Sequence, residues 1–300
     1  MIKTLDLNFL GIERAIAAFI VDTSEGPILI ESGPYSTFPV LVEQIKSSGY
    51  QPADIRHVFL THIHFDHAGA AWALAREGAQ VYVHPFGARH LAHPEKLVNS
   101  ARRIYKEDMD RLWGDMQPIP EGRLRSVEHQ EVIKVGDTEV KAWHTPGHAV
   151  HHITWQIGDQ LFTGDVAGVR VHPEDQVVEP PCPPPDINVE DWLDSIKTIR
   201  ALKPKAMYLT HFGKTEDIDW HLQELERRLM EWSNWIKEKM EEGKEAEETV
   251  PEFKAFVAKQ LRDMGISETA IKQYEAANPS YMSVSGLMRY WKKKQEREQS

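Results

Sequence analysis

The chain has 300 residues, a formal net charge of −11 and 41% hydrophobic residues, which is enough for one large core with an appended subdomain. Its acidic balance argues against a nucleic-acid partner held by phosphate contacts, and its single cysteine, Cys182, excludes an intrachain disulfide. Residues 15–21 form an apolar run too short to span a bilayer, so we expect a cytoplasmic protein without a membrane partner.

Apolar runs of strand type alternate with helical patterns in the first part of the chain. Within residues 2–31, the turn Ser24-Glu25-Gly26 separates two strand-like runs, and Gly33-Pro34 breaks the chain before the first helix. This alternation predicts an α/β layer. The predicted strands are residues 15–21, 27–30, 58–60 and 81–83, and the predicted helices lie at residues 40–45 and 68–76.

Residues 86–126 interrupt this alternation with an amphipathic helical pattern. We interpret them as a helical insertion that either packs on the sheet or forms a wall of the active site. Two predicted hairpins follow, with the turns Gly136-Asp137 and Gly158-Asp159. Residues 180–185 are too rich in proline for a helix or a strand, so we expect a stiff, extended loop.

The last part of the chain is predicted to be mainly helical. A helix at residues 191–202 and a strand at residues 206–209 precede helices from about residue 216 onward. Residues 237–248 are dense in Lys and Glu and are expected on a solvated helix face or in an exposed loop. We interpret the lysines at 292–294 as a frayed helical tail, not as a nucleic-acid patch, because acidic residues lie nearby.

The most informative segment is Thr61-His62-Ile63-His64-Phe65-Asp66-His67, which directly follows an apolar run. Three histidines and one aspartate fall within six residues there. A loop at a strand end can direct several such side chains at one point. Imidazole and carboxylate are ligands that suit zinc, iron and manganese, and two ligand pairs at this spacing suggest two neighbouring metals.

Three later segments share one design, in which a strand-like run ends and a metal-competent side chain follows. His148 comes after a Pro-Gly turn, Asp165 ends a hairpin strand, and His211 follows the last strand. Each motif is weak alone, but their order after the first segment makes the set specific.

With these motifs the chain resembles the metallo-β-lactamase superfamily of metal-dependent hydrolases, whose His-x-His-x-Asp-His signature stands at residues 62–67. The resemblance covers roughly residues 2–215. It implies an α/β fold, a four-layer αββα sandwich, here with a helical insertion and a helical C-terminal extension. We therefore expect a catalytic domain at residues 1–215, with its insertion at about 86–126, and an extension at residues 216–300 packed on it.

The resemblance also implies a ligand set of seven residues for two divalent metal ions. It assigns His62, His64 and His148 to one metal, and Asp66, His67 and His211 to the other, while Asp165 bridges both. Zinc is the expected metal, with iron and manganese as alternatives. Asp66 is the expected catalytic residue, because it can orient the attacking hydroxide and pass a proton to the leaving group.

The expected function is that of a dinuclear metal-dependent hydrolase that uses a metal-bridging hydroxide on a small acyl substrate, namely an ester, a lactone or a thioester. The alternatives are a nuclease or phosphodiesterase, a di-iron redox protein of the same fold, and a non-catalytic protein whose fold the metal stabilises. A small-molecule substrate and no nucleic acid are the expected partners, and a homodimer is left open. Against a lactonase, this chain has Gly168 where the lactonases of the superfamily carry a tyrosine.

Several further residues have no assigned role. The family often has Asp-x-Gly after its early strand, where this chain has Glu31-Ser32-Gly33, which is still acidic and near the site. Arg170 and Tyr208 either contact the substrate or pack in the core. The remaining histidines are expected to be structural or exposed, with residues 151 and 152 as candidates for supporting the ligands; they are His84, His90, His93, His144, His151 and His152.

Overall fold

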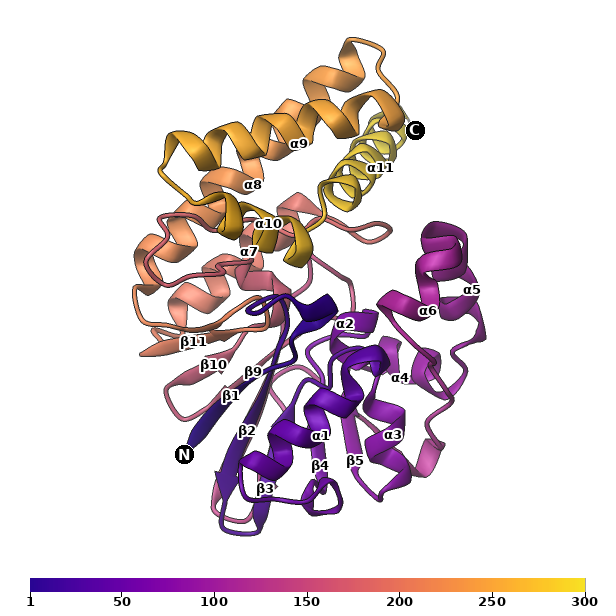
Figure 1. The fold of residues 1–300 in the computed structure, drawn as a ribbon, viewed down its shortest axis with the longest axis vertical. Coiled ribbons are helices and arrows are strands. Elements are labelled where there is room, and N and C mark those ends of the chain that lie inside the picture. Colours follow the sequence, from indigo (N-terminus) through magenta and orange to yellow (C-terminus); the bar gives the residue numbers. More distant parts are fainter. Residues whose placement is uncertain (300) are drawn as a thin grey trace.

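Two six-stranded β-sheets lie face to face in the computed structural model, which describes residues 1–299, and helices cover their outer faces (Figure 1). The first sheet has the order β1-β2-β3-β4-β5-β6, and β3 to β6 run parallel. The second has the order β12-β11-β10-β9-β8-β7 and is antiparallel apart from the β10–β11 pair. The strands are β1 Ile2–Asp6, β2 Ala17–Thr23, β3 Gly26–Ile30, β4 His57–Phe59, β5 Gln80–Val83, β6 Leu124–Ser126, β7 Val132–Val135, β8 Thr138–His144, β9 Ile153–Ile157, β10 Gln160–Phe162, β11 Ala206–Leu209 and β12 Gly213–Thr215.

An aromatic core fills the space between the two sheets. Phe59 stacks on Tyr82 within the first sheet, with ring centroids 4.4 Å apart, and meets Trp155 of the second sheet edge-on at 5.1 Å. Phe19 and Phe162 make a similar contact across the sheets at 5.4 Å. Edge-to-face pairs of this kind suit the charge distribution of aromatic rings, so they favour one register of the two sheets.

The outer faces of the sheets are covered by separate helical layers. On the first sheet, α1 (Phe38–Ser47) and α3 (Ala71–Arg76) bury their apolar residues in one core. On the second sheet, α7 (Val189–Ala201) and α8 (Ile218–Glu241) do the same in another. Because both faces of each sheet are buried, a strand such as β2 is apolar at successive positions and does not alternate. The expected four-layer sandwich is confirmed.

The insertion after β5 is helical for most of its length. It contains α4 (Pro85–Ala92), α5 (Glu95–Tyr105) and α6 (Met109–Leu112). The prediction was wrong at its end, because Leu124–Ser126 is strand β6, which pairs parallel with β5. This edge strand has three residues, two of them exposed, so it lacks the apolar pattern that marks a strand in sequence.

Four helices form the C-terminal part of the chain, at the top of Figure 1. After α8 come α9 (Ala246–Asp263), α10 (Glu268–Ala277) and α11 (Ser280–Glu298), and Trp232 of α8 packs edge-on against Phe253 of α9. These helices share the outer core of the second sheet with α7. The domain boundary at residue 216 therefore stays a prediction, and β12 just before it was not expected from the sequence.

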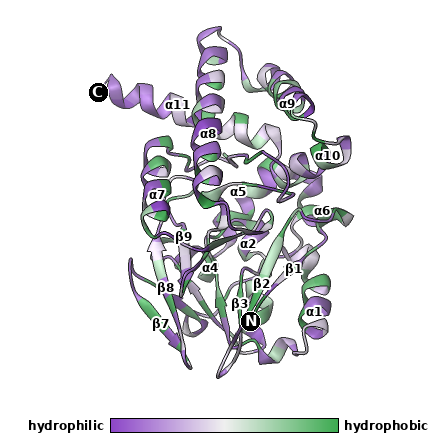
Figure 2. Cartoon of the chain, turned by 90° about the vertical axis from the view of Figure 1, so that its left-hand side faces the viewer, coloured by the Kyte–Doolittle hydropathy of each residue, from purple (hydrophilic) through white to green (hydrophobic). Residues whose placement is uncertain are grey.

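The tail of α11 is not frayed as the sequence suggested. The helix continues to Glu298, and Lys294 pairs with Glu190 of α7 and with the Tyr290 hydroxyl. Figure 2 shows that α11 turns hydrophilic towards the C-terminus, in agreement with its many charged residues. Within residues 1–299, none of the helices combines the length and the apolar character needed to cross a bilayer.

A buried carboxylate lies where the C-terminal helices meet the rest of the molecule. Glu179 is 2% exposed, and its Oε2 accepts a hydrogen bond of 3.2 Å from Asn278, while its Oε1 has no partner among the described residues. Burial raises the pKa of Glu179 from 4.5 to about 7, although the Arg228 guanidinium acts in the opposite direction. Between pH 4.5 and about 7, Glu179 is therefore mainly protonated in the folded chain and mainly ionised in the unfolded chain.

We predict that Glu179→Gln stabilises the protein at alkaline pH only. With a raised pKa, the contribution of Glu179 to stability is present below pH 4.5 and is lost as the pH rises through about 7. The neutral amide removes this loss, so at pH ~8 the variant should gain about 3 kcal/mol in the free energy of unfolding. Urea unfolding curves at pH ~4.5 and ~8 provide the measurement. The control Glu247→Gln removes the same charge from an exposed position of α9 and should show no such pH dependence.

Candidate metal centre

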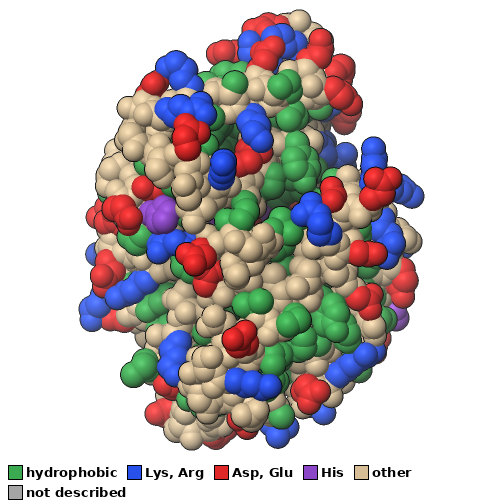
Figure 3. Space-filling model, viewed as in Figure 1, with side chains coloured by type: hydrophobic (Ala, Val, Ile, Leu, Met, Phe, Trp, Pro, Cys, Tyr) green, Lys and Arg blue, Asp and Glu red, His purple; other side chains and the backbone are tan. Residues whose placement is uncertain are grey.

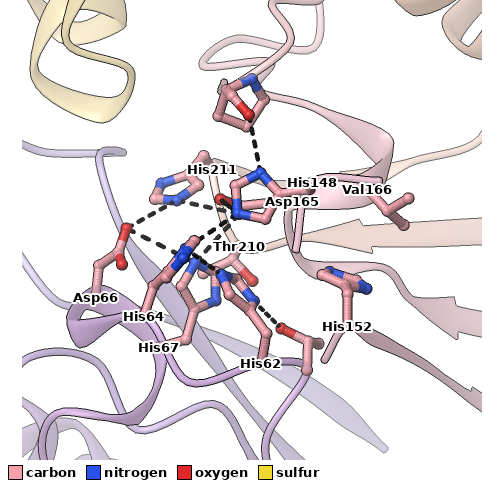
Figure 4. Close-up of polar contacts among 12 residues, drawn as sticks. His62, His64, Asp66, His67, His148, His152, Asp165, Val166, Thr210 and His211 are labelled. Atoms are coloured by element: carbon pink, nitrogen blue, oxygen red, sulfur yellow. Dashed lines mark hydrogen bonds and ion pairs between the residues drawn. The ribbon is translucent and has the colours of Figure 1, made fainter. Parts of the chain in front are cut away.

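The seven predicted ligands lie together at one edge of the sandwich, where strands from both sheets end (Figure 4). They come from four strand ends because parallel strands such as β10 and β11 deliver their following loops to the same edge. His62 and His64 follow β4, Asp66 and His67 lie on α2 (Phe65–Ala68), His148 follows β8, Asp165 lies in the 3₁₀ helix Gly164–Ala167 after β10, and His211 follows β11.

Three imidazoles form the first group. His64 Nδ1 lies 2.9 Å from His62 Nε2 and 3.1 Å from His148 Nε2. These three nitrogen atoms are close enough together to share one metal ion. The sequence-based grouping of His62, His64 and His148 therefore agrees with their positions, while their role as ligands stays a prediction.

A second group lies beside the first. Asp66 Oδ2 is 3.5 Å from His211 Nε2 and 3.7 Å from His67 Nε2. Asp165 stands between the groups: its Oδ2 lies 3.3 Å from His148 Nε2, and its Oδ1 lies 3.1 Å from His67 Nε2. One oxygen of this carboxylate thus faces each group, which is the position expected of a bridging ligand.

The outward nitrogens of these rings are held by hydrogen bonds. Nδ1 of His148 donates to the Pro181 carbonyl at 2.8 Å, and Nδ1 of His211 donates to the Ala15 carbonyl at 2.6 Å. Because a carbonyl oxygen only accepts, both rings donate through Nδ1, which leaves Nε2 as the nitrogen that faces the other candidate ligands. Such outer hydrogen bonds fix the tautomer and the orientation that a metal ligand needs.

Glu31 joins the strand ends beneath the site. It is fully buried, and its Oε1 accepts from His67 Nδ1 at 3.0 Å and from the hydroxyls of Thr61 and Thr210. Because the Thr61 hydroxyl donates to Glu31, it accepts from His62 Nδ1, 3.0 Å away. The two threonines were missed in the sequence, although each directly precedes a predicted ligand, as Thr61-His62 and Thr210-His211.

The electrostatic environments of the two groups differ. Burial lowers the pKa of His62 well below its ordinary value and lowers the pKa of His148 to about 4. Burial acts in the same direction on His211, but the carboxylates of Asp165 and Asp66 outweigh it and raise its pKa to about 10. The first group thus keeps neutral imidazoles, while the two carboxylates favour a positive charge at the second.

The residues fit divalent cations. Among the described residues, His67 Nε2 and Asp165 Oδ1 are buried without a hydrogen-bond partner, and both point into the space between the groups. Imidazole nitrogens and carboxylates that converge in this way raise the free energy of the folded chain unless a positive charge lies among them. A cation bound among them compensates both, and mixed imidazole and carboxylate donors suit zinc, iron or manganese.

A cavity of about 620 Å³ opens above the site. Its floor carries His64, Asp66, Asp165 and His211, and its walls include the insertion and the proline-rich loop. Arg170 and Tyr208, which the sequence offered as possible substrate contacts, do not line this cavity. Arg170 is buried and pairs with Asp217 at 2.7 Å, and Tyr208 stacks on Phe162 in the inner core.

The remaining histidines have separate roles. His144 donates to the Val127 carbonyl at 2.9 Å, and the Nδ1 of His84 accepts from the backbone N–H of Phe86 at the start of α4. His152 is buried behind His62, with ring centroids 5.1 Å apart, and hydrogen-bonds Thr145 at 2.9 Å. His151 lies on the cavity wall. His152 is thus structural, and its packing behind His62 leaves the supporting role for which it was a candidate a prediction.

The family model of the metallo-beta-lactamase superfamily matches residues 11–211. The chain belongs to this superfamily. Its members are metal-dependent hydrolases, so the prediction of an enzyme of this class is confirmed at the level of the family. The family match and the clusters of His and Asp side chains together support divalent metal binding.

Two relatives illustrate the similarity in sequence. The metallo-beta-lactamase fold-containing protein ST1585 of Sulfurisphaera tokodaii is 31% identical over 162 residues, which cover 52% of this chain but only 60% of that relative. An N-acyl homoserine lactonase of Bacillus thuringiensis is 26% identical over 223 residues, covering 65% of this chain and 79% of the lactonase.

Two solved structures share the fold. The metallo-beta-lactamase family protein TTHA1429 from Thermus thermophilus has a TM-score of 0.66 at 17% identity, and the likeness covers 99% of this chain and 94% of that chain. The archaeal ST1585 structure has a TM-score of 0.62 at 22% identity and covers 75% of this chain and 85% of that one. At these identities the likeness shows the fold alone.

Asp165 gives the sharpest test of the ligand assignment. Because its carboxylate faces both groups, we predict that Asp165→Ala folds but loses at least one metal and nearly all activity. Asp165→Asn should also fail, since a neutral amide does not balance two dications. Metal per chain is measured by elemental analysis, with far-UV circular dichroism to verify folding.

His144→Ala is the control for this experiment. His144 lies in the same part of the chain as His148 but bonds the Val127 carbonyl, so its loss should leave the metal content unchanged. Two full equivalents of metal in folded Asp165→Ala would contradict the bridging role.

Proposed function

We propose that this protein is a dinuclear metal hydrolase that cleaves a small acyl substrate, with an ester or a thioester as the favoured class. The observation that carries the proposal is the Asp165 carboxylate, which stands between two groups of candidate ligands on the floor of an accessible cavity. A structural zinc typically needs four ligands and no cavity, so seven candidates below an opening favour catalysis. Zinc is the proposed native metal.

The chain's own residues have distinct parts in the proposed reaction. His62, His64 and His148 would hold one cation, Asp66, His67 and His211 the other, and Asp165 both. Two bound divalent cations supply an activated water and stabilise negative charge on the attacked carbonyl oxygen. Asp66 lines the cavity, and its side chain is 22% exposed, so it can accept a proton from the attacking water and pass it to the leaving group.

No side-chain nucleophile is needed for this chemistry. Cys182 is fully buried, and burial raises the pKa of its thiol well above the ordinary value, which keeps it protonated. Its sulfur lies 3.5 Å from the Pro180 carbonyl, in the hydrogen-bonding direction. Cys182 therefore belongs to the packing of the proline-rich loop.

The local structure explains why no tyrosine stands at position 168. Gly168 has a φ of +80°, and a Cβ there would come within 2.8 Å of the Glu179 carbonyl oxygen and of Leu225. A side chain at this position would clash with the loop and with α8. The similarity to an N-acyl homoserine lactonase keeps lactones among the substrates to be tested, but this chain cannot use a tyrosine at that position.

Turnover that depends on metal is the first test. The metal-loaded protein should hydrolyse members of an ester, lactone and thioester panel, lose this activity in excess chelator, and regain it when zinc is added. A phosphodiester and a single-stranded RNA serve as comparisons. Turnover confined to these two, or visible absorption with mainly iron in protein purified without added metal, would instead favour a nuclease or a di-iron protein.

The proton transfer assigned to Asp66 gives a second prediction. Asp66→Asn keeps the shape of the side chain but cannot accept a proton, so kcat should fall at least about a hundredfold while KM changes less. Steady-state kinetics on the best ester provide the measurement, with metal content determined on the same sample. A variant with full metal content and wild-type kcat would refute this role.

A further inference from the structure

The cavity above the candidate metal centre has two walls from distant parts of the chain. One wall is α5 of the insertion together with Trp113. The other is the bend between α10 and α11, at residues 275–282. The Tyr105 hydroxyl of α5 approaches the Met282 sulfur of α11 at 3.9 Å, so the walls meet on one side. The C-terminal helices, which lie outside the matched family region, therefore help to enclose the site.

The mouth of this cavity is ringed by exposed apolar side chains. Leu10, Phe86, Ile104 and Tyr281 are 43%, 37%, 44% and 38% exposed, and all four line the cavity. They come from four separate elements, and Figure 3 shows apolar side chains along the notch between the upper helices and the lobe at the right. Apolar groups gathered in this way around an opening mark a surface that a ligand covers.

The charges on the rim do not favour an ionic ligand. Arg111 is paired with Asp108 at 3.0 Å, and Glu275 is paired with Lys254 at 3.1 Å. The other charged residues of the lining include one cation and one anion, Lys96 on α5 and Asp186 beside the proline-rich loop. A neutral, apolar group therefore fits this space better than a phosphate or a second carboxylate does.

We infer that the substrate carries a long or bulky apolar group, and that this group lies between α5 and the α10–α11 bend while the scissile carbonyl lies over the candidate ligands. The inference rests on the proposed function for the reaction, but the apolar site itself does not depend on turnover. A cavity of about 620 Å³ is large enough to enclose a group of this size. Ile104 and Tyr281 are the residues that determine the preference for this group.

The test compares esters that differ only in the apolar group. For the metal-loaded full chain, kcat/KM for p-nitrophenyl octanoate should exceed that for p-nitrophenyl acetate by at least about tenfold, because each buried methylene adds to transition-state binding. In Ile104→Lys and Tyr281→Lys this preference should fall at least about fivefold, with the metal content unchanged. Met230→Lys is the matched control, because Met230 is also exposed, at 40%, but lies on α8 away from the cavity.

A binding measurement separates this inference from the proposed reaction. Methyl nonyl ketone is neutral and is not hydrolysed, and calorimetric titration should show that it binds the wild type and Met230→Lys but binds Ile104→Lys far more weakly. This pattern without turnover of any ester would support the apolar site and reject the hydrolase. Equal rates on both esters, or equal ketone binding by Ile104→Lys and the wild type, would overturn the inference.

Discussion

The constraint on which the structure depends is the close approach of several imidazole nitrogens to the carboxylates of Asp66 and Asp165 at one edge of the sandwich. Three imidazole nitrogens lie within 3.1 Å of a neighbour, and Asp165 is 3% exposed beside them. Without a cation, neighbouring acceptors and anions repel each other in a medium of low dielectric constant. The hydrogen bonds that His148, His211 and His67 donate to the Pro181 and Ala15 carbonyls and to Glu31 help to hold the rings in place.

Close packing of the backbone also helps to hold the loops in place. Gly147 has a φ of +129°, and a Cβ there would lie 2.3 Å from the Trp192 Cα, so the turn before His148 lies directly against α7. Gly164 leaves a similar space for Thr61 and His152, since a Cβ there would lie 2.4 Å from the Thr61 hydroxyl. The two glycines thus allow loops of the second sheet to approach neighbours that a larger residue would displace.

Local sequence patterns were sufficient for most of the strands and for the motifs of the candidate ligands, but not for contacts between distant segments. The segment at residues 61–67 and the later His148, Asp165 and His211 carried the resemblance to the superfamily, and the grouping that this resemblance implied agrees with the positions of these side chains. The three-residue edge strands β6 and β12 carry too little apolar pattern to be recognised. The α10–α11 bend at the cavity could not be foreseen either, since its partners on α5 are more than a hundred residues away.

The candidate ligands are divided between the two halves of the sandwich. His62, His64, Asp66 and His67 belong to the half that contains the first sheet, and His148, Asp165 and His211 belong to the other half. Each proposed metal position draws on both halves, so an ion bound there would act as a cross-link between the sheets. Binding to the folded chain alone adds to its stability in proportion to the logarithm of free metal. Removal of a bound ion would thus weaken the contact between the two halves of the sandwich at this edge.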